Sequence, residues 1–436
     1  MSFNSILFLI FFLPVFMAIY YICPKQYRFL VLLLFSVIFY YYAGLMNLGI
    51  LIIAAIANYL FGLFTGKNKV LFAVSIIFNI SLLCFFKYNR NYLLPLGMSF
   101  YTFNNLSYLI DVYKGECNKE NNPLYYMTYA LMFPTISMGP LSNYSTIRNN
   151  LNDLKWDTDR ISKGVRRFVI GLIKKCIVAD NLGDLYGNLL NANDKSILMN
   201  LVMIIVFGIQ LYIDFSSYSD MAIGIGQMIG LEYKENFDYP YMSDTITNFW
   251  RRWHMSLNRF FTKYVYIPLG GNRVSTFRHI INIMIVWLLT GIWHGSSFNF
   301  VIWGIYYGVI LILEKYALAK YLEKMPKALK HLYVLIIVFI GYIFFSSKNL
   351  SDIGNNFVSM FRLPFISNSI VFYLKENAVL LIVGILLCFR IPERIRKTFN
   401  SGINAYILDT ALILLFILSL SYILSGKFLP FLYGAF

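Results

Sequence analysis

Apolar segments long enough to cross a membrane recur along almost the whole chain, and they constrain its fold more than any other feature. About 20 consecutive apolar residues span a bilayer as a helix. Only 13% of the 436 residues are charged, which is about half the share found in soluble domains. The expected spans are residues 3–22, 29–42, 48–65, 70–86, 198–213, 280–293, 298–314, 332–345, 371–389 and 405–424. We therefore predict an all-α polytopic membrane protein with about 11–12 transmembrane helices.

The net charge of +16 comes from basic residues in short connections between the apolar segments. In a soluble protein such a charge would suggest nucleic acid. Here the positive-inside rule explains it better, so no nucleic-acid partner is expected. The first connections alternate between basic (Lys25 and Arg28, then Lys67 and Lys69) and uncharged (43–47), which predicts an extracytoplasmic N-terminus.

Two kinds of irregular helix are expected between the spans. Residues 94–113 begin with Pro-x-Gly inside an apolar segment, which is typical of a broken or re-entrant helix. Residues 160–181 place basic side chains on one helical face and apolar ones on the other, which predicts a helix lying in the membrane interface. The alternative for this second segment is the end of an ordinary spanning helix.

A polar, aromatic-rich stretch, residues 244–297, holds three of the four histidines. Such a stretch is costly inside a membrane protein and is therefore the first place to seek function. A helix expected over 248–264 places Trp250 and His254 on one face and Arg252 on the opposite face. His254 is either a buried core histidine or an active-site partner. The arginines suit an anionic ligand or anchor lipid headgroups.

His294 ends an apolar segment sixteen residues after Arg278. That separation corresponds to about 24 Å of helix, and the hydrocarbon core is about 30 Å thick, so His294 is expected below the outer surface. It is either a structural residue that ends the helix or a group that handles protons. Histidine suits general base catalysis because its pKa lies near neutral pH.

Two carboxylates, Asp214 and Asp220, lie in a further apolar stretch. Carboxylates at membrane depth are rarely without a role. The alternative is a structural role, in which they cap helices or pair with arginines. The glycine-rich turn at 267–272 allows close approach of the backbone, and His279 is expected to anchor the membrane interface.

Several classes of site lack support in the sequence. The chain has no Gly-x-Ser-x-Gly motif and no HExxH motif. Its histidines lack the paired spacing of metal ligands, so no metal is expected. Its five cysteines are scattered and indicate neither a disulfide framework nor a zinc site.

Seven stretches between Pro95 and Gly304 carry a resemblance to a known family. They are PLGMSFYTF (95–103), FPTISMGP (133–140), GLIKKCIVADNL (171–182), DFSSYSDMAIGIGQMIG (214–230), NFWRRWHMSLNRFF (248–261), YIPLGGNR (266–273) and GIWHGSSFNFVIWG (291–304). The chain resembles the membrane-bound O-acyltransferase superfamily, in particular its bacterial branch of alginate and peptidoglycan O-acetyltransferases. The pattern departs at Ser217, where relatives often have glycine, and at Ser142 and Asn143, where an arginine is common.

This resemblance implies helices arranged around a central funnel and two catalytic histidines. His294 corresponds to the family's nearly invariant membrane histidine and His254 to a second, more variable polar position. Further contacts with substrate are expected from Trp250, Arg251, Arg252, Trp253, Asp214, Ser216, Asp220, Trp293 and Asn272. We expect one integral membrane domain, with N-terminal helices at 1–90, the acyltransferase core at 91–314 and C-terminal helices at 315–436.

The expected function is transfer of an acyl group, acetyl by resemblance, to a hydroxyl of an extracytoplasmic cell-surface polysaccharide. The resemblance implies acetyl-CoA or an acyl carrier thioester as donor, with no permanently bound cofactor. It also implies the bacterial cytoplasmic membrane, contact with membrane lipid, and in some members an exported SGNH-type acetyltransferase partner. The alternatives are a transporter or flippase of an anionic lipid-linked glycan, and an acyltransferase acting on a lipid or protein.

Overall fold

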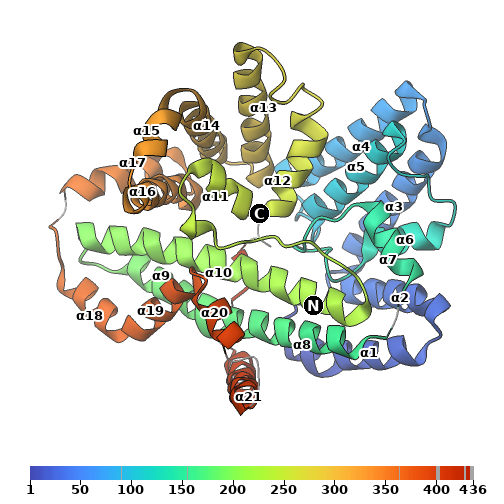
Figure 1. Cartoon of the computed structure of the whole chain (residues 1–436), viewed down its shortest axis with the longest axis horizontal. Helices are drawn as coiled ribbons and strands as arrows, with labels where there is room; N and C mark the ends of the chain where they lie inside the picture. The colour runs from blue at the N-terminus through green and yellow to red at the C-terminus, as the bar shows by residue number, and fades with distance from the viewer. Residues whose placement is uncertain (90, 155, 363, 399–402, 427–428, 433–436) are drawn as a thin grey trace. The chain divides into compact units, whose positions relative to one another are not determined.

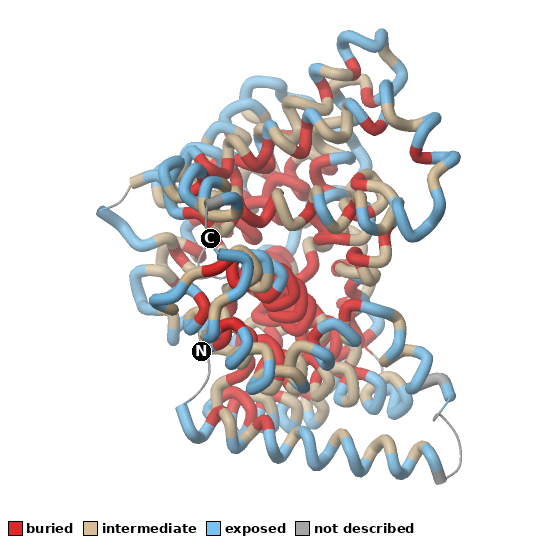
Figure 2. Tube along the Cα trace, turned by 90° about the vertical axis from the view of Figure 1, so that its left-hand side faces the viewer, coloured by how far each residue is buried: buried red, intermediate tan, exposed pale blue. Residues whose placement is uncertain are grey.

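The computed structural model describes residues 1–89, 91–154, 156–362, 364–398, 403–426 and 429–432. In these ranges every regular element is a helix (Figure 1). Figure 2 shows the burial of each described residue along the trace. The prediction of an all-α polytopic membrane protein is confirmed.

The chain forms two compact units. Unit 1 contains Met1–Leu172 and Tyr218–Glu235, and unit 2 contains Ile173–Ser217 and Asn236–Leu432. The three-part division expected from the sequence, like the central funnel, stays a prediction.

The helices of unit 1 come mainly from the first part of the chain. They are η1 (Leu7–Phe12), α1 (Leu13–Ile22), α2 (Arg28–Tyr41), α3 (Leu45–Thr65), α4 (Lys69–Tyr88), α5 (Met98–Lys114), α6 (Pro123–Leu131), α7 (Tyr144–Asn152) and most of α8 (Thr158–Ile173). α5 begins directly after Gly97, which has a left-handed backbone (φ 69°), and it is buried along almost its whole length. The break expected at Pro-x-Gly therefore lies before the helix and not inside it.

Unit 2 contains most of the remaining helices. They are η3 (Lys174–Ala179), α9 (Asp180–Asn191), the first part of α10 (Ile197–Ile229), α11 (Ile246–Arg252), α12 (Met255–Phe261), α13 (Thr276–His294), α14 (Phe298–Leu313), η6 (Glu314–Leu318), α15 (Ala319–Lys324), α16 (Lys327–Ser346), α17 (Leu350–Arg362), α18 (Asn368–Glu376), α19 (Ala378–Leu387), α20 (Ile391–Thr398) and α21 (Ile403–Leu424). The amphipathic segment predicted at 160–181 is helical, but its residue Lys175 is buried. The interfacial position of that segment stays a prediction.

Seven helices of the described residues are long and apolar enough to cross a membrane, or eight if one bent pair is a single span. The bent pair is α18 and α19, which meet at 66° where one span, 371–389, was expected. The expected count of about 11–12 included shorter segments, since Leu7–Ile22 and Arg28–Tyr41 fall below this length. The multi-pass character is confirmed, but the number of full-length spans is smaller than expected.

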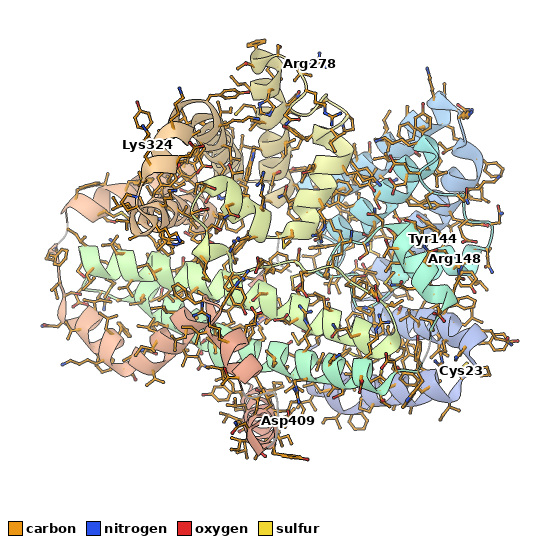
Figure 3. All side chains as sticks on the ribbon, in the orientation of Figure 1. Cys23, Tyr144, Arg148, Arg278, Lys324 and Asp409 are labelled. Atoms are coloured by element: carbon orange, nitrogen blue, oxygen red, sulfur yellow. The ribbon has the colours of Figure 1, made fainter. Side chains whose placement is uncertain are left out.

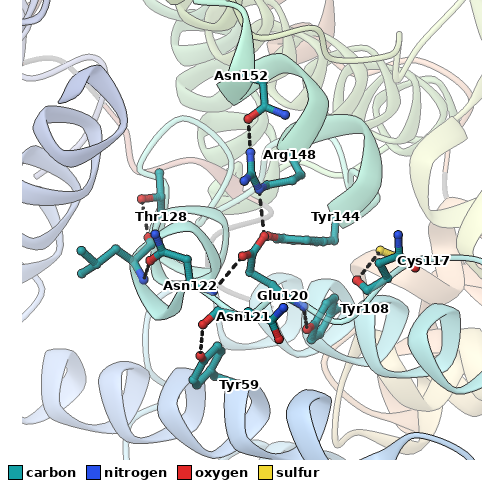
Figure 4. Close-up of polar contacts among 12 residues, drawn as sticks. Tyr59, Tyr108, Cys117, Glu120, Asn121, Asn122, Thr128, Tyr144, Arg148 and Asn152 are labelled. Carbon is teal, nitrogen blue, oxygen red and sulfur yellow. Dashed lines mark hydrogen bonds and ion pairs between the residues drawn. The ribbon is translucent and has the colours of Figure 1, made fainter. Parts of the chain in front are cut away.

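The loop between α5 and α6 is held to α7 by one carboxylate, Glu120 (Figure 4). The Tyr144 hydroxyl donates to Glu120 Oε2 over 2.6 Å, and Arg148 Nε donates to the same oxygen over 2.8 Å. The backbone N–H of Asn122 donates to Oε1. Burial alone would raise the pKa of Glu120, but these hydrogen bonds outweigh it and lower the pKa. Unit 1 therefore orders a long polar loop without secondary structure.

Candidate active site

Glycines bring α13 and α14 into close backbone contact. A Cβ on Gly291 would lie 2.4 Å from the carbonyl oxygen of Phe300, and one on Gly304 would lie 2.4 Å from that of Trp287. Any side chain at either position would force the two helices apart. Arg278 lies in the first turn of α13 (Figure 3), and His294 is the last residue of the same helix. The glycine contacts therefore place His294 directly against α14.

His294 is buried among aromatic rings of unit 2. Only 3% of the residue's surface is exposed. The centre of its ring lies 4.9 Å from that of Trp303, 5.2 Å from that of Phe345 and 4.7 Å from that of Trp293. An imidazole in such surroundings is shielded from water, which suits a group that must exchange a proton with a bound substrate.

His254 occupies a break between two short helices, so the continuous helix predicted over 248–264 is wrong. α11 ends at Arg252 and α12 begins at Met255, and His254 between them has a left-handed backbone (φ 44°, ψ 53°). Left-handed geometry is uncommon for residues with a side chain and is often found at functional sites. The helical face on which Trp250 and His254 were expected to align therefore does not exist.

The structure nevertheless brings His254 to the same aromatic group as His294. The centre of the His254 ring lies 6.1 Å from that of Trp293 and 4.7 Å from that of Phe215. Burial, with Arg259 nearby, lowers the pKa of His254 to about 3, so its imidazole is neutral at physiological pH. Trp293 thus contacts both predicted catalytic histidines.

Trp250 extends this aromatic group along α11. Its ring centre lies 5.5 Å from that of Trp303 and 4.8 Å from those of Trp287 and Tyr307. Its Nε1 is buried and has no hydrogen-bond partner among the described residues. A buried indole N–H can donate to a ligand, and the contact of Trp250 with substrate stays a prediction.

The other predicted contacts near α11 differ in exposure. Trp253 is buried and packs against Phe249 at 5.6 Å between ring centres. Arg251 is exposed, and Arg252 is partly buried with Nε donating to Asn248 Oδ1 over 3.2 Å. Asn272 is exposed in the glycine-rich turn. Arg251 and Asn272 therefore lie at the surface of unit 2, whereas Trp253 is buried, and contact of these residues with substrate stays a prediction.

The predicted polar residues of α10 have protein partners. Asp214 Oδ1 lies 2.7 Å from Lys175 Nζ, which also lies 2.6 Å from Asp180 Oδ1. Lys174 Nζ donates to Ser216 Oγ over 2.7 Å.

Asp220 belongs to unit 1. There it forms an ion pair with Arg167 at 2.9 Å. The structural alternative for the two aspartates is therefore observed as ion pairing, and their contact with substrate stays a prediction.

Two residues that position the site were missed in the sequence. Glu314 accepts hydrogen bonds from the backbone N–H groups of Ile246 (2.6 Å) and Thr247 (2.9 Å), so it caps the start of α11. Asn236 contacts His254 and the first residues of α12. A lone acid ending the apolar segment 298–314 was a usable signal for Glu314, whereas nothing in the sequence distinguished Asn236.

His279 has protein partners in unit 2. It is buried at the start of α13, where the hydroxyls of Tyr266 and Tyr316 lie 2.7 Å and 2.6 Å from its ring nitrogens. The expected role as an interfacial anchor stays a prediction. No group of three or more potential metal ligands lies within the part of the chain that the structure describes.

Fold and site together define a multi-pass helical membrane protein with two buried histidines in one aromatic group. Residues 117–351 match the membrane-bound O-acyltransferase family. The probable alginate O-acetylase of Azotobacter vinelandii is 34% identical over 83% of this chain and 78% of that protein. The peptidoglycan O-acetyltransferase of Helicobacter pylori is 31% identical over 87% of this chain and 84% of that protein. The teichoic acid D-alanyltransferase of Bacillus subtilis is 30% identical over 50% of this chain and 58% of that protein.

The chain therefore belongs to the membrane-bound O-acyltransferase family, and it is an acyltransferase. The resemblance inferred from the sequence motifs is confirmed.

Proposed function

We propose that this enzyme moves an acyl group from a thioester to a hydroxyl of a cell-surface polysaccharide, and that the acyl group is acetyl. The observation that carries the proposal is the contact of His254 and His294 with the same buried tryptophan, Trp293. The relatives support a glycan acceptor, since those named above act on alginate, peptidoglycan and teichoic acid.

The reaction requires the protein to position the two substrates and to supply one general base. A thioester is already activated, so the acceptor hydroxyl must be held close to its carbonyl carbon and deprotonated. His294 takes the hydroxyl proton as the oxygen attacks. The carbon–sulfur bond then breaks, and the departing thiolate takes up the proton held by His294 as the ester is released. The aromatic surroundings of His294 keep water from competing with the hydroxyl.

The donor and the cellular setting complete the proposal. The donor is acetyl-CoA or an acyl carrier thioester on the cytoplasmic side of the bacterial inner membrane, and the acceptor is extracytoplasmic. An exported SGNH-type acetyltransferase is the proposed partner where the acyl group is handed on. Because the chain belongs to an enzyme family, the transporter alternative is set aside.

Arg251 and Arg252 offer a test of donor binding. Replacing Arg251 and Arg252 with Gln is expected to raise the KM for acetyl-CoA more than it lowers kcat, because phosphates bind equally in ground and transition states. The measurement is thiol release from acetyl-CoA by purified protein in detergent. The matched control changes Lys320 and Lys324, two exposed basic residues of α15, to Gln. An unchanged KM in the arginine variant would favour headgroup anchoring as the role of these arginines. If the unmodified protein released no thiol, acetyl-CoA would be excluded as the donor.

Membrane orientation offers a second test, since it sets the direction of transfer. The region 315–330 carries five lysines, so a reporter fused after Leu322 is expected to be cytoplasmic. A reporter after Asn349, beyond α16, is expected to be extracytoplasmic. Fusions to a phosphatase active only outside the cytoplasm and to a fluorescent protein active only inside it measure both positions. The reverse result at both sites would invert the proposed direction of acyl transfer.

A further inference from the structure

The break that presents His254 is held by a short segment from elsewhere in unit 2. The backbone N–H of Asp238 donates to the carbonyl of Arg252 over 3.0 Å, on one side of the break. On the other side, the N–H of Met255 donates to the carbonyl of Asn236 over 2.9 Å. These bonds satisfy backbone groups that a continuous helix would otherwise pair internally. The segment 236–238 therefore stabilises the left-handed conformation of His254.

The side chain of Asn236, which is completely buried, adds a constraint on the imidazole itself. Its Oδ1 accepts a hydrogen bond from the backbone N–H of Ser256 over 3.0 Å. A backbone amide only donates, so the atom of Asn236 at this position is the oxygen. The same oxygen lies 3.2 Å from Nδ1 of His254. Because that oxygen only accepts, Nδ1 must carry the hydrogen.

A neutral imidazole carries one proton, so a proton on Nδ1 leaves the lone pair on Nε2. We propose that Asn236 is a positioning residue that holds His254 in this single tautomer, so that Nε2 accepts a hydrogen bond from the substrate. The inference rests on the proposed function for its substrate. A group that contacts Nε2 must then be a donor, and a second hydroxyl of the acceptor sugar, next to the one that is acylated, fits this requirement whereas the thioester carbonyl does not. His254 thus orients the acceptor sugar through this second hydroxyl, while His294 takes the proton of the hydroxyl that is acylated.

The tautomer is measurable without any turnover. We suggest labelling the protein with 15N-histidine and recording 15N spectra in detergent, with the His254 signals assigned from their absence in His254→Gln. The unmodified protein is expected to show a protonated Nδ1 and an unprotonated Nε2 for His254. Asn236→Leu is expected to lose this preference, whereas Asn236→Asp keeps it because a carboxylate still accepts from Nδ1. The matched control is Asn58→Leu, an equally buried asparagine of unit 1, which should leave the His254 signals unchanged.

Activity provides the second readout. Asn236→Leu is expected to lower kcat by at least about 10-fold, by analogy with the loss when the partner of a metal-bound histidine is removed, and Asn236→Asp should recover part of this loss. A protonated Nε2 in the unmodified protein would overturn the proposal, as would an unchanged tautomer in Asn236→Leu. If Asn236→Leu does not fold, the spectra of the unmodified protein and of Asn236→Asp still show which ring nitrogen of His254 is protonated. Absence of acyl transfer with the expected spectra would contradict the proposed function and leave the tautomer assignment standing.

Discussion

Replacing His294 with alanine is expected to abolish acyl transfer while the protein still inserts and folds. General base catalysis contributes about 10² to 10⁴-fold, so loss of the base should be nearly complete in a cell assay. The measurement is acyl transfer by the purified variant, alongside its thermal unfolding. The control is His331→Ala in α16, a histidine whose Nδ1 lies 2.8 Å from the carbonyl of Ser243, and it should retain activity. Full activity in a folded His294→Ala protein would exclude the proposed mechanism.

Substitutions at the two histidines should also differ in their pattern. His254→Ala is expected to lose less activity than His294→Ala, since water can replace part of an orienting contact. His254→Asn should retain more activity than His254→Ala, because an amide still accepts a hydrogen bond. His294→Asn should not recover, because an amide does not take up the proton. An equal loss in all four variants would remove the distinction between base and orienting residue.

Replacing Lys175 with methionine is expected to destabilise unit 2 severely. Lys175 and Asp214 are each 1% exposed, and Asp180 is 2% exposed. Removing the lysine leaves two buried carboxylates without their cation, and breaking one buried ion pair costs about 3–5 kcal/mol. Asp214→Asn should cost less, since Lys175 still pairs with Asp180 at 2.6 Å. Thermal unfolding in detergent measures both effects.

The ion pair of Arg390 with Asp238 supplies the control. Its two atoms lie 2.7 Å apart, but the side chains are 43% and 40% exposed. Exposed pairs contribute about 0–1 kcal/mol, so Arg390→Gln should unfold close to the unmodified protein. A Lys175→Met protein as stable as Arg390→Gln would argue against a structural role for the buried cluster. Asp214 would then return to the group of substrate-binding candidates.

The sequence alone could predict the membrane class, most of the helices and the choice of His254 and His294 as candidate functional residues. Apolar length decides whether a segment can cross a bilayer, and this property is local to the segment. The burial of His294 beside Trp293 was likewise foreseeable, because both residues end the same apolar segment. Family motifs added the catalytic assignment, which local properties do not supply.

The conformation at His254 was decided only by the tertiary structure. The sequence of 248–264 favours a continuous helix, but Asn236 and Asp238 supply hydrogen bonds that stabilise a break. Lys175 is a second case. Its helical segment has an amphipathic pattern, yet Lys175 is buried, where it forms ion pairs with Asp180 and Asp214. In both cases a residue outside the local helix contributes: Asn236 lies 18 residues before His254, and Asp214 lies 39 residues after Lys175. Local pattern determines which helices form, and these distant polar contacts determine where a helix breaks and which charges are buried.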